Sequence, residues 1–178
     1  MRAVRAATYI VILCAVAIGV RDSVWIPWTC ERRKAALERA TLSVATSASA
    51  YWAKAQANRN LEQIERCRTK LPTDLDYMML AAANLRVIGR SAEAVEIYRA
   101  ALATARRPEL YWNLGEAYAE TGKEDQAFRW MLQAAYFAPA YIDNMDSQGE
   151  LRARLQEGVR QRESLIRAGK WRPDYGSQ

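Results

Sequence analysis

The chain has 178 residues, with 26 lysines and arginines, 20 aspartates and glutamates, and no histidine. It therefore lacks the commonest general base, the commonest metal ligand and the imidazole of every Ser/His or Cys/His nucleophile. The formal charge of +6 is spread along the chain, with acids and bases interleaved. We expect no enzyme, no cofactor, no metal site and no nucleic-acid interface. Frequent alanine, with only eight glycines and five prolines, predicts an almost entirely α-helical chain.

An apolar segment opens the chain. Residues 6–20 are uncharged and mostly apolar, and they follow Arg5. A membrane span needs about 20 residues, a length that the segment approaches if Arg5 extends its guanidinium to the head groups. Trp25 and Trp28 would then lie at the membrane interface, where tryptophan is enriched. We expect residues 1–28 to be an uncleaved transmembrane anchor.

Two alternatives stay open for this segment. Ala15-Val16-Ala17 has the A-x-A form of a signal-peptide cleavage site, and the segment could also be a soluble helix. The charges that decide membrane orientation conflict, because basic residues flank both ends: Arg2, Arg5, Arg21, Arg32, Arg33 and Lys34. An apolar run so close to Met1 resembles a signal-anchor. We therefore expect a single-pass protein of the bacterial inner membrane with its folded part in the periplasm.

The cysteines fit an exported domain. Cys14 lies in the apolar run, which leaves Cys30 and Cys67 as an even pair outside the membrane. They either form a disulfide that ties the membrane-proximal segment to the domain, or remain two packed thiols. A single unbroken helix between them would hold them too far apart to bond.

Turn and cap signals divide the rest of the chain into helices. A break is expected at Asn58-Arg59-Asn60, and Gly89 and Gly122 each stop a helix. Ser147-Gln148-Gly149-Glu150 has the form of a capping box. The expected helices cover about residues 30–58, 61–70, 74–87, 91–105, 108–121, 124–137 and 148–168.

The second half of the chain matches itself when it is shifted by 33 residues. The shift places Gly89 on Gly122 and Ala82 on Gly115. The other matched pairs are Leu85 and Tyr118, Ala94 and Ala127, Tyr98 and Met131, and Ala101 and Ala134. Each unit reads helix, glycine turn, helix. A period of this size with one helical hairpin per unit is the mark of a solenoid.

Residues 75–141 resemble the tetratricopeptide-repeat (TPR) family. The unit 108–141 carries the family pattern at Leu114-Gly115, Tyr118, Gly122, Ala127, Ala134 and Pro139. The resemblance implies an all-α, short TPR-type solenoid of antiparallel hairpins, in which Gly115 and Ala127 let two helices cross closely. The expected parts are the anchor (1–28), membrane-proximal helices that form a degenerate repeat (29–71), two TPR units (72–141), and a capping helix with a tail (142–178).

In TPR folds the first helix of each hairpin lines the concave face of the solenoid. The inward positions of the family correspond here to Asp76, Met79, Leu80, Ala83, Arg86, Glu109, Trp112, Asn113, Glu116 and Glu120. This face is either an open partner-binding groove or is covered by the N-terminal helices or the last helix. The family's carboxylate clamp is not expected, because Met79 and Ala83 occupy the places of its lysine and asparagine.

The last predicted helix has a basic outer face, formed by Arg152, Arg154, Arg160, Arg162 and Arg167. Glutamates interleave with these arginines, so the helix is either a solvated cap or a contact for anionic lipid or an acidic subunit. We expect the chain to be a membrane-anchored scaffold or adaptor that binds protein subunits of a membrane-associated complex. The alternative is a structural subunit that self-assembles into rings or filaments through its solenoid ends.

Overall fold

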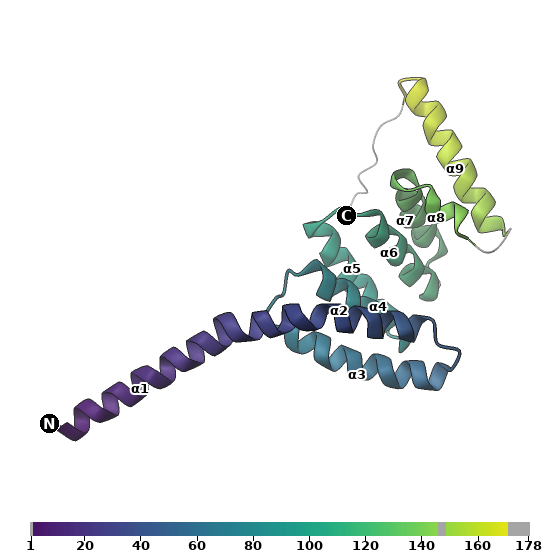
Figure 1. Cartoon of the computed structure of the whole chain (residues 1–178). Helices are drawn as coiled ribbons and strands as arrows, with labels where there is room; N and C mark the ends of the chain where they lie inside the picture. Colours follow the sequence, from purple (N-terminus) through teal and green to yellow (C-terminus); the bar gives the residue numbers. More distant parts are fainter. Residues whose placement is uncertain (1, 146–148, 171–178) are drawn as a thin grey trace. The chain divides into compact units, whose positions relative to one another are not determined.

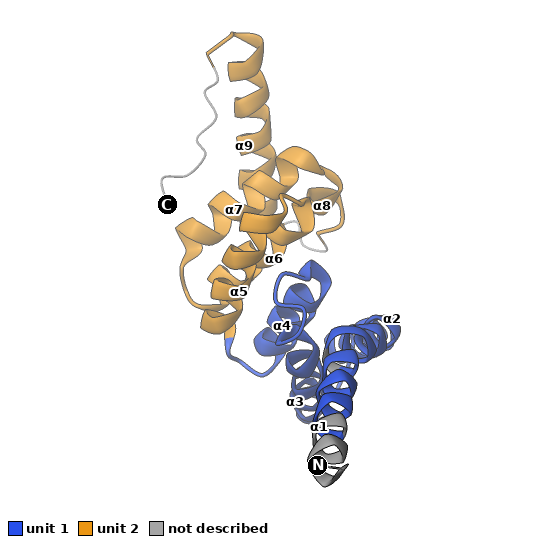
Figure 2. Ribbon diagram, turned by 90° about the vertical axis from the view of Figure 1, so that its left-hand side faces the viewer, with its two compact units in different colours: residues 1–90 blue, residues 91–178 orange. Residues whose placement is uncertain are grey.

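The computed structural model describes residues 2–145 and 149–170, and this part of the chain contains helices and turns but no strand (Figure 1). The helices are α1 (Arg2–Val20), the π-helix η1 (Arg21–Trp25), α2 (Ile26–Ala45), α3 (Ala50–Arg68), α4 (Leu75–Val87), α5 (Ser91–Thr104), α6 (Pro108–Glu120), α7 (Glu124–Phe137), α8 (Ala140–Asp143) and α9 (Glu150–Arg167). The predicted all-α fold is confirmed. The chain forms two compact units, Met1–Arg90 and Ser91–Gln178 (Figure 2).

The first unit begins with a continuous helical rod made of α1, η1 and α2, whose α1 part extends beyond the body formed by α2, α3 and α4 (Figure 1). The π-helix has a local cause. Pro27 has no N–H and cannot donate to the carbonyl four residues earlier. The preceding Ile26 N–H donates instead to the Arg21 carbonyl, five residues back. One wider turn therefore carries the helix past the proline without ending it.

Helices α2 and α3 form an antiparallel pair, and α4 packs against both. The chain turns at residues 46–49, where Ser49 caps α3 by accepting a hydrogen bond from the Trp52 N–H (3.3 Å). The break predicted at Asn58–Asn60 is wrong, because α3 continues through it to Arg68. Asparagine favours helix ends when its amide competes for backbone groups, but the Asn60 amide is bound by other side chains.

A buried chain of hydrogen bonds joins the three helices. Gln56 Nε2 donates to Asn60 Oδ1 (2.9 Å), and Asn60 Nδ2 donates to Asn84 Oδ1 (3.3 Å). Asn84 Nδ2 in turn donates to Thr41 Oγ1 and to the Leu80 carbonyl, both at 2.8 Å. Asn84 is fully buried. Because Thr41, Asn60 and Asn84 lie on α2, α3 and α4, this network fixes the register of all three helices.

The predicted glycine turns are confirmed at the ends of α4 and α6. Gly89 and Gly122 have φ of +85° and +74°, in the left-handed region that glycine adopts without a steric penalty. In both turns the residue after glycine donates its N–H to the carbonyl five positions earlier, at 2.8 Å for Arg90 and 3.0 Å for Lys123. This is the Schellman ending, which satisfies the last carbonyls of a helix.

In the second unit, α6 and α7 cross closely at Gly115, as predicted. A Cβ placed on Gly115 would lie 2.6 Å from Met131 Cγ and 3.0 Å from the Ala127 carbonyl oxygen. The missing side chain thus lets the two backbones approach, and their packing offsets the roughly 1 kcal/mol that glycine costs within a helix. The equivalent small residues of the preceding repeat, Ala82 on α4 and Ala94 on α5, are fully buried.

We expect Gly115→Ala to destabilise the second unit, although alanine is the better helix former. The added methyl group meets the α7 backbone, and such overpacking costs about 1–3 kcal/mol, more than the ~1 kcal/mol of helix propensity gained. Thermal unfolding of the full chain in detergent measures the effect. Gly158→Ala is the matched control, because its Cβ meets the flexible end of Leu132 at 2.8 Å instead of backbone. An unchanged melting temperature for Gly115→Ala would contradict the close crossing.

Helix α9 packs against α7 and caps the last hairpin of the second unit. The two helices run parallel, since Arg154 lies over the Phe128 ring and Arg162 over the Tyr136 ring, eight residues further along in each helix. Leu155 is fully buried between them and α8. The predicted capping box is wrong, because α9 begins at Glu150 with Gly149 as its N-cap and no side-chain cap. Residues 147 and 148 of that predicted box and the tail 171–178 lie outside the described residues.

Candidate binding surfaces and the charged cluster beside the disulfide

The predicted face on α6 is centred on Trp112. Its indole ring stacks on Tyr141 of α8, with ring centroids 5.0 Å apart and an interplanar angle of 23°. The indole N–H donates to Glu116 Oε1 (3.0 Å). Trp112 also packs against the buried cluster of Met131, Ala135, Ile142 and Leu155. The ring is therefore half-buried, and α8 covers part of this face.

Acidic groups surround this aromatic centre. Glu109, Asn113 and Glu116 are half-buried and Glu120 is exposed. Burial raises the pKa of the Tyr141 hydroxyl, and the carboxylates of Glu109 and Glu116 raise it further. The α6 face, defined by Trp112, Tyr141, Glu109 and Glu116, thus combines half-buried aromatic side chains with negative charge.

The predicted face on α4 lies in the other unit and partly contacts α2. Asp76 Oδ2 lies 3.3 Å from Lys34 Nζ on α2. Leu80 is buried, and its carbonyl accepts the hydrogen bond from Asn84. The other three predicted residues, Met79, Ala83 and Arg86, are half-buried. The N-terminal end of this face therefore packs within the first unit.

The arginines predicted on the outer face of α9 divide into two groups. Three contact neighbouring elements: Arg152 reaches the Met145 carbonyl (3.5 Å), and Arg154 and Arg162 lie 4.7 Å and 3.6 Å from the centroids of the Phe128 and Tyr136 rings. The other two are exposed and pair with acids on their own helix: Arg160 with Glu157 (2.9 Å) and Arg167 with Glu163 (3.4 Å). Each of the five thus has a partner.

A shallow cleft of about 520 Å³ lies between α7 and α9. Its apolar wall is formed by Phe128, Leu132, Tyr136 and Leu165, and its polar rim by Glu150, Arg154, Glu157, Gln161 and Arg162. The sequence does not predict this cleft, because the aromatic residues of α7 follow no pattern that separates a surface from the core. The cleft has charges of both signs on its rim.

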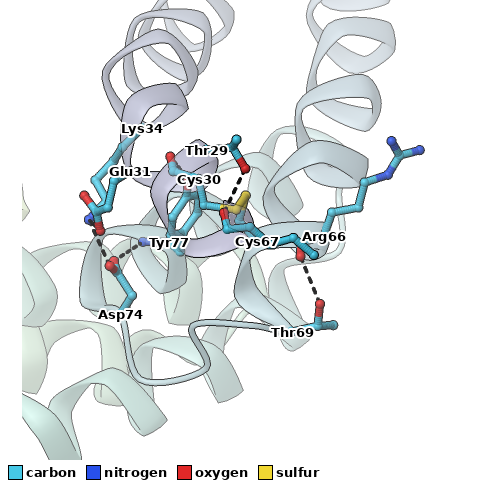
Figure 3. The surroundings of a disulfide bond; sticks show 10 residues. Thr29, Cys30, Glu31, Lys34, Arg66, Cys67, Thr69, Asp74 and Tyr77 are labelled. Atoms are coloured by element: carbon cyan, nitrogen blue, oxygen red, sulfur yellow. Dashed lines mark hydrogen bonds and ion pairs between the residues drawn. A yellow bond between two sulfur atoms is a disulfide. The ribbon is translucent and has the colours of Figure 1, made fainter. Parts of the chain in front are cut away.

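A disulfide between Cys30 and Cys67 joins the start of α2 to the end of α3 in the first unit (Figure 3). The two Cα atoms are 5.6 Å apart, and the cysteines are 37 positions apart in the sequence. Both side chains are buried. The turn at residues 46–49 makes this pairing possible, because it returns the end of α3 to the start of α2.

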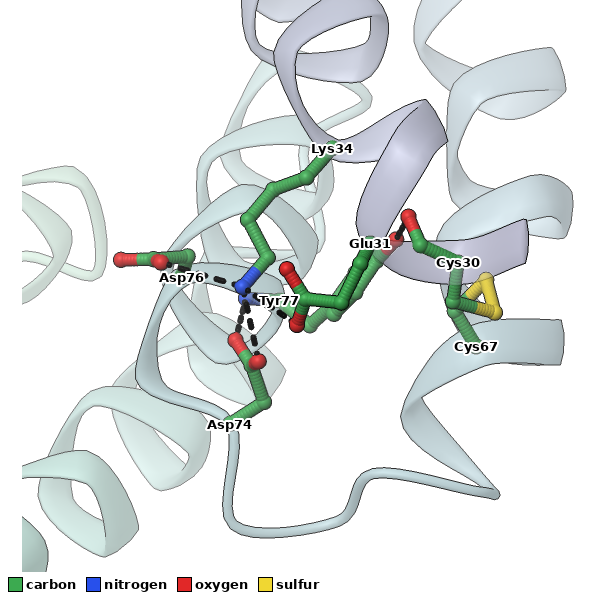
Figure 4. Close-up of polar contacts among 7 residues, drawn as sticks. All are labelled: Cys30, Glu31, Lys34, Cys67, Asp74, Asp76 and Tyr77. Carbon is green, nitrogen blue, oxygen red and sulfur yellow. Dashed lines mark hydrogen bonds and ion pairs between the residues drawn. A yellow bond between two sulfur atoms is a disulfide. The ribbon is translucent and has the colours of Figure 1, made fainter. Parts of the chain in front are cut away.

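A charged cluster lies beside the disulfide (Figure 4). Lys34 Nζ lies 2.8 Å from Asp74 Oδ2, 3.1 Å from Glu31 Oε1 and 3.3 Å from Asp76 Oδ2. Asp74 also caps α4, since its Oδ1 accepts the Tyr77 N–H (3.1 Å). The Tyr77 hydroxyl donates to the backbone carbonyl next to the disulfide, that of Cys30 (2.7 Å). The cluster therefore connects α2, the start of α4 and the disulfide.

In this cluster the pKa values of Asp74 and Lys34 both shift in the direction that favours the ionised form. Burial by itself acts to raise the pKa of Asp74, but the hydrogen bonds from Lys34 and the Tyr77 N–H outweigh it and hold the pKa below the ordinary 3.8. Burial likewise acts to lower the pKa of Lys34, and the hydrogen bonds to Asp74 and Glu31 outweigh it, so this pKa rises above the ordinary 10.5.

These shifts predict how stability changes with pH. The lowered pKa of Asp74 contributes stability that is present above pH 3.8 and is lost as the pH falls through the folded value. The raised pKa of Lys34 contributes stability below pH 10.5 that is lost as the pH rises through its folded value. We expect Lys34→Met to lower the free energy of unfolding by about 2 kcal/mol at neutral pH, because it removes hydrogen bonds between charged groups. The variant should also lose less stability than the wild type when the pH is lowered, because the pKa of Asp74 is then closer to its ordinary value. Urea unfolding across this pH range, with the exposed Lys54→Met as control, measures both effects; an unchanged acid limb would contradict the assignment.

The rod before this cluster is apolar from Ile10 to Val20 and again at Val24, with the polar residues 21–23 between them. The helix that contains residues 10–45 is long and apolar enough to cross a membrane, as far as length and composition can show. Its large apolar side chains from Ile10 to Val24 are more than half exposed. Trp25 and Trp28 follow, with ring centroids 5.4 Å apart, and the Arg32 guanidinium lies 4.6 Å from the centroid of the Trp28 ring.

Among the described residues, no group of three or more histidine, cysteine or acidic side chains is placed to hold a metal ion. The features described so far are helix faces, a cleft and an apolar rod.

Comparison with known proteins gives one family. Residues 108–141, which contain α6, α7 and the start of α8, match the family model described as tetratricopeptide repeat. No curated protein and no solved structure matches the chain. The match covers the hairpin whose glycine crossing and Schellman turn are described above. Residues 108–141 are therefore a tetratricopeptide repeat, and the other helical repeats of the chain are consistent with that family.

Proposed function

We propose that this chain is a membrane-anchored TPR scaffold that holds protein subunits of a membrane-associated complex, without catalytic activity of its own. TPR repeats suggest protein–protein interaction. The observation that carries the proposal is the joining of such a repeat, through the first unit, to an apolar helical rod. The proposed parts are an anchor (1–28), membrane-proximal helices (29–71), two TPR units (72–141) and a cap with a tail (142–178).

The exposed apolar surface of the rod supports the anchor. These side chains would be costly to leave in water, at about 25 cal/mol per Å² of apolar surface. The following tryptophans lie where interfacial aromatics are enriched. An anchor also confines the chain to two dimensions and raises its effective concentration for other membrane subunits. A weak binding face would then suffice.

The disulfide supports a location of the folded part outside the cytoplasm, on the periplasmic side of a bacterial inner membrane. Disulfides persist in oxidising compartments and are rare in the cytosol. We expect one reactive cysteine per chain, Cys14, when cells are quenched with acid and their proteins are dissolved in SDS, because the chain has three cysteines and two are paired. Mass-tagged maleimide before and after reduction counts them. Three reactive thiols without reductant would place the domain in the cytoplasm instead.

The α6 face supports binding of a partner segment that is both basic and apolar. Glu109 and Glu116 supply negative charge beside the Trp112–Tyr141 pair, and complementary charges raise association rates and specificity. We expect subunits that co-purify with the wild-type chain in mild detergent to be lost from the double variant Glu109→Lys, Glu116→Lys. Glu62→Lys, on an exposed position of α3, changes the same kind of charge elsewhere and serves as control.

Two results would count against the scaffold. If the wild-type chain is recovered alone under mild extraction, it holds no stable partner and the scaffold proposal fails. A mass in light scattering that rises with concentration would favour self-assembly through the solenoid ends instead. We expect the mass of the detergent-solubilised chain to be independent of concentration.

A further inference from the structure

A ladder of aromatic and basic side chains runs along the outer face of the rod, at the point where its apolar surface ends. It consists of Trp25, Trp28 and Arg32, at helical spacings of three and four residues. The tryptophans are 60% and 47% exposed. The Arg32 guanidinium lies over the Trp28 ring, 4.6 Å from its centroid. This ladder is on α2 and η1 of the first unit and takes no part in the α6 face.

The stacking leaves the hydrogen-bonding edges of Arg32 available. A guanidinium carries five N–H donors in its own plane, and a ring under its face uses none of them. Within the part of the chain that the structure describes, no acidic side chain forms an ion pair with Arg32. The neighbouring Glu31 contacts Lys34 instead, in the cluster with Asp74 and Asp76. Arg32 is therefore a positioned cation whose counter-ion is not supplied by these residues.

The place of this cation along the rod indicates its ligand. Arg32 follows Trp28 by four residues, or about 6 Å along the helix axis. The head-group layer adds about 5–7 Å to each side of the hydrocarbon core. If the tryptophans lie at the interface, Arg32 lies at the depth of the lipid phosphates. Arg39, seven residues later on the same helical face, would lie about 10 Å further from the membrane.

We propose that Trp25, Trp28 and Arg32 form a binding surface for the phosphate of anionic phospholipid head groups, on the leaflet that faces the folded domain. This inference rests on the proposed anchor. The Arg32 guanidinium donates two parallel hydrogen bonds to phosphate oxygens, a geometry that suits arginine better than lysine. The Trp28 ring holds the guanidinium in place, and the tryptophan pair lies against the upper acyl chains. Cys30, two residues after Trp28, forms the disulfide that links this part of the rod covalently to α3.

Native mass spectrometry of the full chain tests the proposal. The detergent-solubilised protein is mixed with equal amounts of phosphatidylglycerol and phosphatidylcholine, and the retained lipids are counted. We expect the wild type to retain phosphatidylglycerol preferentially. Arg32→Gln should lower the ratio of the two lipids about fivefold, the factor that corresponds to the ~1 kcal/mol of one basic residue near an anionic surface. Arg32→Lys should give an intermediate ratio.

Arg39→Gln is the matched control, because Arg39 is exposed on the same face two turns away and should leave the ratio unchanged. Trp28→Leu keeps an apolar side chain but removes the stacking ring, and should lower the ratio less than Arg32→Gln. Circular dichroism checks that each variant is folded. Equal retention of both lipids by the wild type, or equal losses for Arg32→Gln and Arg39→Gln, would overturn the proposal. Displacement of the lipid by inorganic phosphate would assign the surface to a soluble anion and overturn it as well.

Failure of the anchor gives a different result. If the chain is released from membranes by alkaline carbonate, the proposed membrane scaffold fails, whatever lipids it binds in detergent. If the chain stays in the membrane fraction but shows no preference for phosphatidylglycerol, only the lipid surface fails.

Discussion

Replacing Cys67 with serine is expected to lower the free energy of unfolding of the first unit by about 3–4 kcal/mol. The disulfide closes a loop of 37 positions, and such a cross-link restricts the unfolded chain by about this amount. A loss of this size corresponds to a melting temperature lower by on the order of 10 °C. Reduction of the wild-type protein should give the same result, because it breaks the same bond. Hydrogen exchange of the full chain in detergent locates the effect, which should appear in α2 and the end of α3.

The third cysteine supplies the control. Cys14 is exposed on the rod and is not bonded, so Cys14→Ser should leave the melting temperature and its response to reductant unchanged. The double variant Cys30→Ser, Cys67→Ser should be no less stable than either single variant, because all three lack one and the same bond. Additive losses would indicate that the cysteines stabilise the unit as separate packed thiols, not as a pair.

Replacing Asn84 with alanine is expected to cost about 3 kcal/mol. The change leaves the buried Thr41 hydroxyl and Asn60 amide without one partner each, and an unsatisfied buried polar group costs about 1–3 kcal/mol. The loss stays below the sum of two full penalties, since Asn60 keeps its bond from Gln56. Denaturant unfolding of the full chain measures it. Asn58→Ala is the control, because Asn58 is exposed and bonds only its own helix.

A double-mutant cycle tests whether this network acts as one unit. Thr41→Val alone should cost about 1 kcal/mol, since Asn84 Nδ2 keeps its bond to the Leu80 carbonyl. In the Asn84→Ala background, Thr41→Val should lower the free energy of unfolding by almost nothing further, because the Asn84 amide that bonds Thr41 is already absent. Additive costs would show that the hydrogen bond between α2 and α4 contributes little.

Both predictions concern the part of the molecule that connects the rod to the repeats. The disulfide, the Lys34 cluster and the asparagine network all join α2 to α3 or α4. A rod inserted in a membrane would therefore hold the first unit rigidly, because α2 is both the continuation of the rod and a packed helix of that unit. Such a connection would limit the orientations that the first unit takes relative to the membrane.

Local sequence was enough for the helices and turns of the repeat. Gly89 and Gly122 stop their helices because a left-handed residue is needed there, and this requirement depends on neighbours within five positions. Gly115 was predictable because a glycine inside an apolar helix has few uses other than close packing. The apolar rod with its two tryptophans was equally visible, since length and apolar composition alone identify it.

Asn60 shows why the rest could not be read locally. The polar run Asn58-Arg59-Asn60 predicts a helix break, yet the partners of the Asn60 amide include Asn84, 24 positions away. The partners of Lys34 are similar, because Asp74 lies 40 positions away. Which of the two states Cys30 and Cys67 adopt depended on where the chain turned. Hydrophobic spacing and turn residues act over a few positions and are written in the sequence, whereas the pairing of buried polar and sulfur atoms is settled only when distant helices pack.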